Sequence, residues 1–344
     1  MARESLSRGP TIVDVARAAG VSVSTVSRVM REHADVGAAT RAHVREAIDR
    51  LGYRPSPIAR ALVSGQSRLV TLLVSDITNP FYPQLAKSVE QEAKQAGYAV
   101  VICNTEDRTA ETRRYVERLL RQGLEGVIHA SVARDEQVLL SLMADDRRVV
   151  FTNRRPAQSA VSYVVSDNEG GAVELTRHLL SLGHRRIGFI TGPRWARNAM
   201  ERLKGFRHAM KEVANAQSFV AEGTFSVESG RLAVLEWMKA PDVPTAMIAV
   251  NDSVALGALG ALADGRLRVP EDVALAGFDG TQLSASPLLS LTTVDQHIEN
   301  LGRRSVQILL RQLASVGEFD PVHEVLPTQL LLRGSTLGRP GPTY

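Results

Sequence analysis

A seven-residue segment near the N-terminus, SVSTVSR at residues 22–28, combines short polar side chains with a single arginine. If this segment is helical, Val23, Ser24, Ser27 and Arg28 share one face. Short side chains let a helix approach the floor of the major groove, and a guanidinium can form two hydrogen bonds with the O6 and N7 atoms of guanine. The segment therefore predicts a helix that reads DNA bases.

Polar residues around this segment could hold such a helix on the DNA backbone, because hydroxyl and guanidinium groups donate hydrogen bonds to phosphate oxygens. The candidates for these contacts are Thr11, Arg17, Ser22, Thr25, Ser27 and Tyr53. Ser22 is also placed to cap the reading helix. A three-helix bundle that contacts proteins would show the same apolar spacing, so that alternative stays open at this point.

A second group of polar residues follows the apolar, β-rich runs in the remainder of the chain. Ligands of open parallel sheets bind beyond the carboxyl ends of the strands, so residues at such ends are candidates for a binding cleft. The residues at these positions are Asp76, Asn104, Asn153, Asp167, Asp252 and Asp279. Any single one of them could instead cap the helix that follows it.

The chain carries no pattern that marks a common enzyme site: there is no GxGxxG after a strand, no Walker motif, no HExxH and no GxSxG. His184 follows a glycine that ends a helix, so packing or capping is its expected role. Cys103 lies in the apolar run 98–104 and is expected to be a buried small hydrophobe. We therefore expect no catalytic residue, no metal and no cofactor, with an enzyme on the same core kept as the alternative.

Three helical patterns precede residue 53 and could position the reading segment. They cover 12–19, 23–31 and 41–51, and the turn AGVS joins the first two with helix-turn-helix spacing. Within them, Val15, Ala16, Val26 and Val29 are expected to pack. Residues 1–65 hold ten arginines, no lysine and six acidic residues, so this part carries the whole net charge of +4. Such asymmetry is typical of a nucleic-acid-binding module joined to a neutral domain.

The next segment, YRPSPIARALVSGQSR at 53–68, is predicted to be a hinge. Ser56 and Pro57 form a helix start, and Gly65 a helix end. The helix between them is too short to be stable alone, so we expect it to order only when supported. Apolar residues in it, with Ala59 and Leu62 the candidates for DNA contact, could enter the minor groove and bend the duplex. An ordinary interdomain linker is the alternative.

From residue 70 onward, apolar strand patterns alternate with helical patterns, which indicates βαβ units and parallel sheets. About ten strands are expected, too many for one open sheet, so we predict two. The fold class is thus an all-α helix-turn-helix headpiece followed by an α/β core of two parallel-sheet subdomains. No run of 18 apolar residues is present and the N-terminus lacks the features of a signal peptide, so we expect a cytoplasmic protein without a membrane span.

Ordered motifs along the chain resemble the lactose-repressor (LacI) family of bacterial transcription regulators. They include TIVDVARAAGVSVSTVSRVM, RLGYRPSPIARAL, SDITNPFY, GHRRIGFITGP, RLKGF, VNDSVALGAL, RVPEDVALAGFD and LTTVDQ. The resemblance spans residues 10–336 and implies a core like the periplasmic sugar-binding proteins, similar to that of purine and ribose repressors. It implies a headpiece at 1–55, a hinge at 56–68 and a core at 69–344. Within the core it implies an N-subdomain (about 69–166 plus 297–326) and a C-subdomain (about 167–296 plus 327–336).

The resemblance also assigns roles to matching positions. It places Arg28 as the guanine-reading arginine, Val23 and Ser24 at positions that vary with the operator, and Leu62 as the intercalating hinge leucine. Matching positions also indicate an effector site, to which we add the strand-end Asp76 and the arginine next to Asn153. The predicted effector-site residues are Asp76, Phe81, Tyr82, Asn153, Arg154, Arg202, Phe225, Asn251 and Asp279.

The predicted function is a sequence-specific DNA-binding repressor that a small molecule controls allosterically. A sugar or sugar acid suits the polar and aromatic side chains of the cleft. Ala196 stands where the purine-binding members of the family carry an arginine, so a purine effector is less supported. Gly280 stands where many relatives carry an acidic residue, so the polar groups at the rim of the cleft are expected to differ from theirs. Arg154 and Arg155 could bind an anionic ligand or be exposed loop charges. A sugar-binding protein without DNA binding is a further alternative.

The expected partners are a palindromic operator, the effector and a second copy of the chain. No leucine heptad follows Arg333, so we expect a homodimer rather than a tetramer, acting at the nucleoid. Two-fold symmetry would place two headpieces on half-sites about one helical turn apart.

Overall fold

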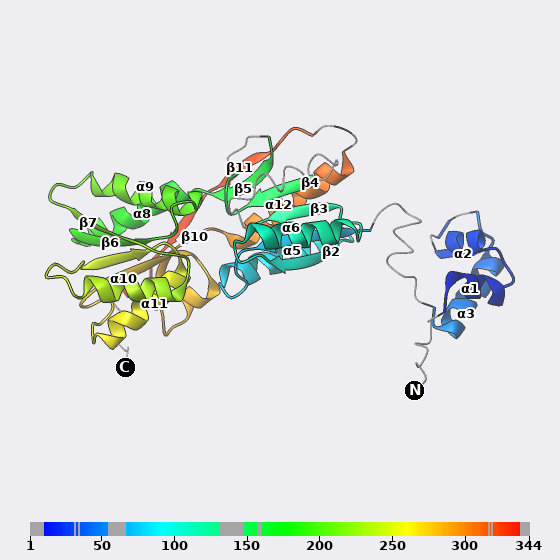
Figure 1. Cartoon of the computed structure of the whole chain (residues 1–344), viewed down its shortest axis with the longest axis horizontal. Helices are drawn as coiled ribbons and strands as arrows, with labels where there is room; N and C mark the ends of the chain where they lie inside the picture. The colour runs from blue at the N-terminus through cyan, green and yellow to red at the C-terminus, as the bar shows by residue number, and fades with distance from the viewer. Residues whose placement is uncertain are drawn as a thin grey trace. The chain divides into compact units, whose positions relative to one another are not determined.

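The computed structural model describes residues 10–30, 32–33, 35–53, 67–130, 148–156, 160–315, 317 and 319–337. The chain divides into two compact units, residues 1–67 and 68–344, and each is described by itself (Figure 1). None of the helices in the described ranges is long and apolar enough to cross a membrane.

Within its described residues, the first unit contains three helices around a small apolar core. Helix α1 spans Ile12–Ala18, α2 Val23–Met30 and α3 Ala38–Leu51. Gly20, in the turn between α1 and α2, has a φ of +61°, a left-handed conformation that glycine adopts without steric cost. The expected packing residues are all buried in the core of this unit, which also contains Ala19, Val44, Ala47 and Tyr53. The helix-turn-helix prediction is therefore confirmed.

The second unit begins with a six-stranded, fully parallel sheet. Its strand order is β11-β5-β4-β3-β1-β2. The strands are β1 (Leu69–Val74), β2 (Ala99–Asn104), β3 (Gly126–His129), β4 (Arg148–Thr152), β5 (Ser162–Ser166) and β11 (His323–Leu326). Helices α5 (Phe81–Gln95) and α12 (Ile298–Ala314) pack on one face, and α6 (Thr109–Leu120) packs on the other. We call this part the N-subdomain.

A second sheet repeats the same order, β12-β10-β9-β8-β6-β7, with only β12 antiparallel. Its strands are β6 (Arg186–Thr191), β7 (Gln217–Glu222), β8 (Ala246–Ala249), β9 (Ala274–Asp279), β10 (Thr292–Asp295) and β12 (Gln329–Leu331). Helices α8 (Asn168–Ser181) and α9 (Arg197–Met210) cover one face, and α10 (Val227–Trp237) and α11 (Asp252–Asp264) cover the other. With the 3-10 turn η1 (Gln282–Ala285) and the short α13 (Gly334–Leu337), these elements form the C-subdomain.

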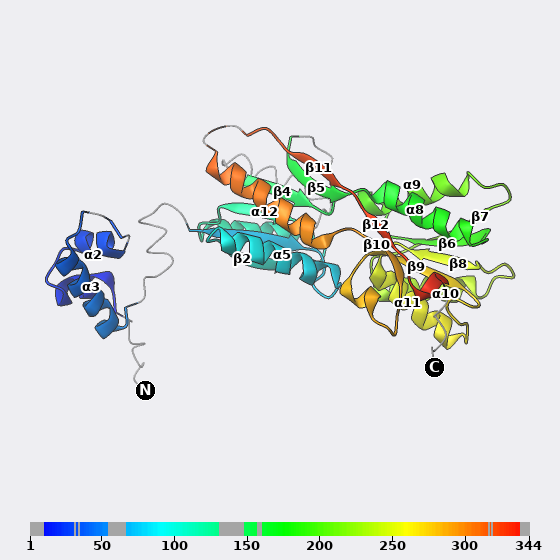
Figure 2. The same ribbon diagram turned by 180° about the vertical axis from the view of Figure 1, so that it is seen from behind.

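The chain crosses between the two subdomains three times: from β5 to α8, from β10 to α12, and from β11 to β12. Figure 2 shows β11 and β12 as one continuous path between the sheets. Gly97, Gly123 and Gly183 follow the ends of their helices with positive φ, whereas Gly265 ends α11 with a φ of −78°. The helix expected after β3 lies outside the described residues.

Candidate functional site

The first candidate site is the exposed face of α2 in the helix-turn-helix unit. Ser22 caps the helix, since its Oγ accepts a hydrogen bond of 3.1 Å from the Thr25 amide and lies 2.7 Å from the Ser24 hydroxyl. Val23, Ser24 and Arg28 are exposed and Ser27 is half-buried, while Val26 and Val29 on the opposite face are buried. The reading face predicted from the sequence thus faces away from the core.

Two of the predicted phosphate contacts have structural tasks in the unbound protein. Thr11 forms a capping box with Asp14: its hydroxyl donates to the Asp14 carboxylate at 2.6 Å, and these hydrogen bonds lower the pKa of Asp14. Tyr53 is only 7% exposed and packs in the core. Arg17 is exposed, with a long 3.7 Å contact to Asp14. DNA contact by these residues stays a prediction, and Ala59 and Leu62 lie outside the described residues.

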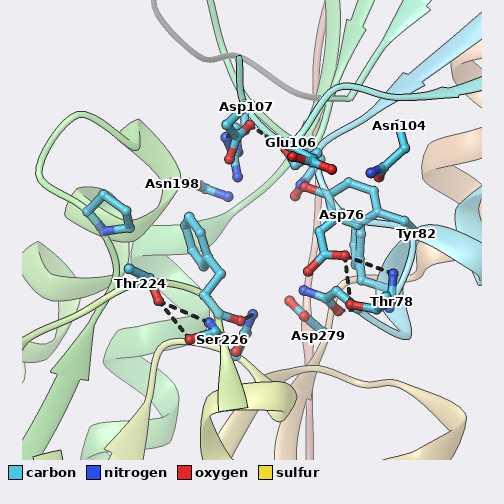
Figure 3. A pocket seen from close by; sticks show the side chains of 18 of the residues that line it. Asp76, Thr78, Tyr82, Asn104, Glu106, Asp107, Asn198, Thr224, Ser226 and Asp279 are labelled. Atoms are coloured by element: carbon cyan, nitrogen blue, oxygen red, sulfur yellow. Dashed lines mark hydrogen bonds and ion pairs between the residues drawn. The ribbon is translucent and has the colours of Figure 1, made fainter. Parts of the chain in front are cut away.

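The second candidate site is a cavity of about 510 Å³ within the second unit. It lies between the carboxyl ends of strands from both sheets, where Figure 3 shows the side chains of the two subdomains facing each other. All nine residues predicted for the effector site line it: Asp76, Phe81, Tyr82, Asn153, Arg154, Arg202, Phe225, Asn251 and Asp279. The volume is within the usual range of small-molecule sites, about 300–1,000 Å³.

Aromatic rings form apolar walls in this cavity. The rings of Phe81 and Tyr82, at the start of α5, meet edge to face with centroids 5.3 Å apart. Burial raises the pKa of Tyr82, so its hydroxyl stays protonated at neutral pH. Trp195 and Phe225, from loops of the C-subdomain, add two further ring faces. Such faces can stack on the apolar side of a sugar ring or on another flat ligand.

Arg154 reaches from the N-subdomain to those C-subdomain rings. Its guanidinium carbon lies 5.4 Å from the centroid of Trp195 and 5.0 Å from that of Phe225. The side chain is 3% exposed and donates to Asp107 at 3.3 Å. Arg154 is therefore not an exposed loop charge, which excludes that alternative for this residue. Arg155 is partly buried with its guanidinium 5.2 Å from the Tyr163 ring.

A buried ion pair forms the floor of the cavity. Arg202 on α9 donates to Asp279 at 3.4 Å, to the Val250 carbonyl at 2.5 Å and to Asn168 at 2.9 Å. Its guanidinium also lies 3.8 Å from the centroid of Phe278. Asp279 accepts a second hydrogen bond, of 2.6 Å, from Gln296. Burial raises the pKa of Asp279 to about 7, although Arg202 acts in the opposite direction.

Other polar groups in the cavity differ in how far they are committed to the protein. Asp76 accepts from the amide and hydroxyl of Thr78 at 2.9 and 2.6 Å. Asn251 caps α11, with its Oδ1 accepting from the Val254 amide at 2.8 Å. In contrast, the Oδ1 of Asn153 is buried and has no hydrogen-bond partner among the residues that the structure describes. An unsatisfied buried acceptor is costly, so a ligand donor at this position would be stabilised.

The prediction that six strand-end residues share one cleft is partly wrong. Asp76, Asn104, Asn153 and Asp279 line the cavity. Asp167 instead caps α8 by accepting from the Gly170 amide. Asp252 is buried behind the cavity, where it accepts from Thr281 and Thr293. Both residues lie at the start of a helix, Asp167 before α8 and Asp252 in α11. For Asp167, the alternative that a strand-end residue caps the next helix is therefore correct.

Several lining residues were not predicted from the sequence: Glu106, Asp107, Pro193, Trp195, Asn198, Thr224 and Ser226. Except for Asn198, which lies in the first turn of α9, they come from loops after strands. The available signal was a tryptophan between arginines, at Trp195. His184 forms a 3.0 Å hydrogen bond with Thr245 and lies outside the cavity, in agreement with its expected packing role. In the described ranges, no three histidine, cysteine or acidic residues are grouped to bind a metal.

Comparison with known proteins places both units in one family. Residues 11–56 match the model for bacterial regulatory proteins of the lacI family, and 176–336 match a periplasmic binding protein-like domain. The ribose operon repressor of Halalkalibacterium halodurans is 35% identical over 95% of this chain and 97% of its own length. The matched length includes both candidate sites.

Two solved structures share the whole architecture. The lac repressor dimer bound to operator and an anti-inducer has a TM-score of 0.83 and 30% identity, covering 96% of this chain and 100% of that one. A complex of the transcriptional regulator CelR with cellobiose has a TM-score of 0.71 and 33% identity, covering 95% of this chain and 99% of that one. The chain therefore belongs to the lacI family of bacterial regulatory proteins, and is a DNA-binding transcriptional repressor, not an enzyme, with an allosteric ligand-binding core.

Proposed function

We propose that the effector is a small polyhydroxylated molecule, a sugar in the first place, which binds in the 510 Å³ cavity and changes operator affinity. The observation that carries this proposal is the coexistence of ring faces with an unpaired buried acceptor. Phe81, Trp195 and Phe225 offer apolar faces, and Asn153 Oδ1 offers an acceptor for a hydroxyl donor. Sugars present both kinds of surface.

The charges of the cavity support a neutral sugar over a sugar acid. Arg202 donates to three protein acceptors and Arg154 donates to Asp107. Four carboxyl groups line the same cavity, those of Asp76, Glu106, Asp107 and Asp279. A ligand carboxylate would lie beside these acidic groups and be repelled by those that are ionised, whereas a neutral hydroxyl group meets no such repulsion.

For the DNA side of the function, we propose that α2 reads an operator half-site through Val23, Ser24, Ser27 and Arg28. The support is the exposure of this face on a capped helix. Arg28 would recognise a guanine, and the small residues would allow close approach. A repressor acts on chromosomal DNA, so we place the protein in the cytoplasm at the nucleoid.

We further propose the surface by which two chains pair. Leu256, Leu259, Leu283 and Leu289 line a small apolar depression on the C-subdomain, and the neighbouring Leu288 is 82% exposed. A leucine this exposed beside an apolar depression is typical of an interface. We propose that a second copy of the chain covers this depression, because the similar lac repressor structure is a dimer bound to operator.

A thermal-shift screen tests the effector proposal, because a ligand that binds the folded state raises the unfolding temperature by mass action. The panel holds neutral mono- and disaccharides, the corresponding sugar acids, and purines. We expect a neutral sugar to stabilise the protein and the shift to disappear in Asn153→Leu. A purine or sugar acid that stabilises more strongly would contradict the proposed class. Arg207→Met, on the exposed face of α9, is the control variant.

A further inference from the structure

The cavity floor is bonded to two of the three segments that join the subdomains. Asn168 is the first residue of α8, directly after the crossover from β5, and its Oδ1 accepts from Arg202 Nε at 2.9 Å. Gln296 lies in the crossover from β10 to α12, and its Nε2 donates to Asp279 Oδ1 at 2.6 Å. Arg202 and Asp279, which themselves pair at 3.4 Å, line the cavity.

These contacts close into a ring. Asn168 Nδ2 donates to the Ser166 carbonyl at 3.1 Å, and the Ser166 hydroxyl donates to the Gln296 carbonyl at 3.2 Å. Hydrogen bonds thus connect Asn168 to Gln296 by two routes: one passes through the Arg202–Asp279 pair, and the other passes through Ser166. Asn168, Arg202, Asp279 and Gln296 are all 4% exposed or less.

Burial makes this ring sensitive to changes at the cavity. Hydrogen bonds to charged groups away from water contribute more than those at the surface, and an unpaired buried partner is costly. A ligand atom that contacts Asp279 or Arg202 must share or replace a bond within the ring. The bonds to Asn168 and Gln296 then change, and both residues lie where the relative angle of the subdomains is set.

We propose that Gln296, together with Asn168, is a positioning residue that transmits ligand contact at the Arg202–Asp279 pair to the angle between the subdomains. This inference rests on the proposed function for its biological role, since the angle is what would control operator affinity. Its structural part, that the Gln296–Asp279 bond holds the angle, applies to the protein without any ligand. The proposal can therefore be tested with no effector.

The test compares Gln296→Met with Gln312→Met in the full-length protein. Gln312 is the matched control because it is also a buried glutamine, with its Nε2 donating to Ser162 at 2.8 Å and its Oε1 unpartnered. Gln312 on α12 and its partner Ser162 on β5 both lie in the N-subdomain, and neither is in a crossover. Equal losses of packing are thus expected from the two variants, but only one loses a contact to the cavity floor.

Single-molecule energy transfer measures the angle between the subdomains. Donor and acceptor dyes are placed on cysteines introduced at the exposed Glu90 of α5 and at the exposed Lys211 directly after α9, with Cys103 replaced by alanine. Labelled chains are diluted into excess unlabelled chain so that each dimer carries one pair. We expect Gln296→Met to shift or broaden the distance distribution and Gln312→Met to leave it as in the parent. An unchanged distribution in Gln296→Met, or equal changes in both variants, would overturn the inference.

Operator binding separates this inference from the proposed function. The probe is a palindromic duplex selected by the parent protein from a randomised pool, without ligand. We expect the Gln296 variant to change the affinity for this duplex by about fivefold or more, the lower end of usual coupling factors. If the parent selects no duplex, the proposed function fails while the energy-transfer result still decides the inference. If Gln296→Met does not fold, Asn168→Leu takes its place in both measurements with the same criteria.

Discussion

Replacing Arg202 by methionine should destabilise the C-subdomain strongly. The methionine side chain is also long and unbranched, but it has no hydrogen-bond donor. The variant loses donors to Asp279, to the Val250 carbonyl and to Asn168, and it loses the cation that lies over Phe278. Removing one partner of a buried ion pair typically costs about 3–5 kcal/mol, because the remaining charge stays buried and uncompensated. For a domain of this size, that corresponds to a fall in Tm of about 6–20 °C.

The loss should depend on pH in a defined direction. Arg202 favours the ionised form of Asp279, whose pKa burial raises to about 7. At pH 5 the carboxyl group of Asp279 is largely protonated, so the missing cation matters less than at pH 8. Differential scanning calorimetry at both pH values measures this. We expect the deficit of Arg202→Met to be larger at pH 8, and Asp279→Asn in the same chain to recover part of it.

A control on the same helix makes the reasoning refutable. Arg207 on α9 is exposed, and its replacement by methionine should change the free energy of unfolding by no more than about 0.5 kcal/mol. If Arg202→Met were as stable as Arg207→Met at pH 8, the ion pair would not hold the cavity floor. The same conclusion would follow if its deficit were equal at the two pH values.

Four further outcomes are expected. Arg28→Ala should lose about 1–3 kcal/mol of discrimination at one base pair per half-site, seen as relaxed specificity in fluorescence anisotropy with single-base variants of the operator. Phe225→Ala should weaken sugar binding in isothermal titration calorimetry while operator binding without ligand is retained, because only a ring face is lost. The contribution of Asp279 to the free energy of unfolding should fall as pH rises from about 4 to about 7, because the folded state holds this proton up to a pKa of about 7 and the unfolded state releases it near 3.8. Buried His129, whose pKa is lowered to about 3, contributes in the opposite direction, so the difference between the parent and Asp279→Asn measures the Asp279 contribution. Leu288→Glu should give monomers in analytical ultracentrifugation, whereas Leu182→Glu, at another exposed leucine, should leave the dimer intact.

The sequence allowed the fold to be predicted because its signals are local and consistent. Apolar spacing and the turn at Gly20 indicated the helix-turn-helix, and continuous apolar strands between helices indicated parallel sheets. Two sheets were inferred from the number of strands alone. The identical strand order in both sheets was not inferred, because pairing between strands distant in the chain leaves no mark in a single sequence.

The cavity was predicted less completely, and the errors have physical causes. Strand-end position indicated Asp76, Asn153 and Asp279, but the same signal also selected Asp252, whose carboxylate is consumed by two threonines from later segments. Arg154 could not be separated from an exposed loop charge, because its burial depends on rings that follow it by 41 and 71 residues.

Gln296 shows a further limit of prediction from residue type. Gln296 ends the motif LTTVDQ, but the resemblance assigned it no role, and its significance comes from a 2.6 Å bond to an aspartate on another strand. The resemblance to a known family supplied the positions of Phe225 and Arg202, which composition and spacing alone would not have selected. The contacts that join the cavity to the crossovers required the structure.

The central claim is that a sugar in the core cavity and an operator on the helix-turn-helix unit affect each other's binding. The most direct test measures operator affinity by fluorescence anisotropy with and without the sugar that stabilises the protein, and sugar affinity with and without operator, at two salt concentrations. We predict the same factor in both directions at each salt concentration, about 5–150-fold, because coupling between two sites is reciprocal. Operator affinity that does not respond to a bound sugar, or binding that is independent of DNA sequence, would contradict the account.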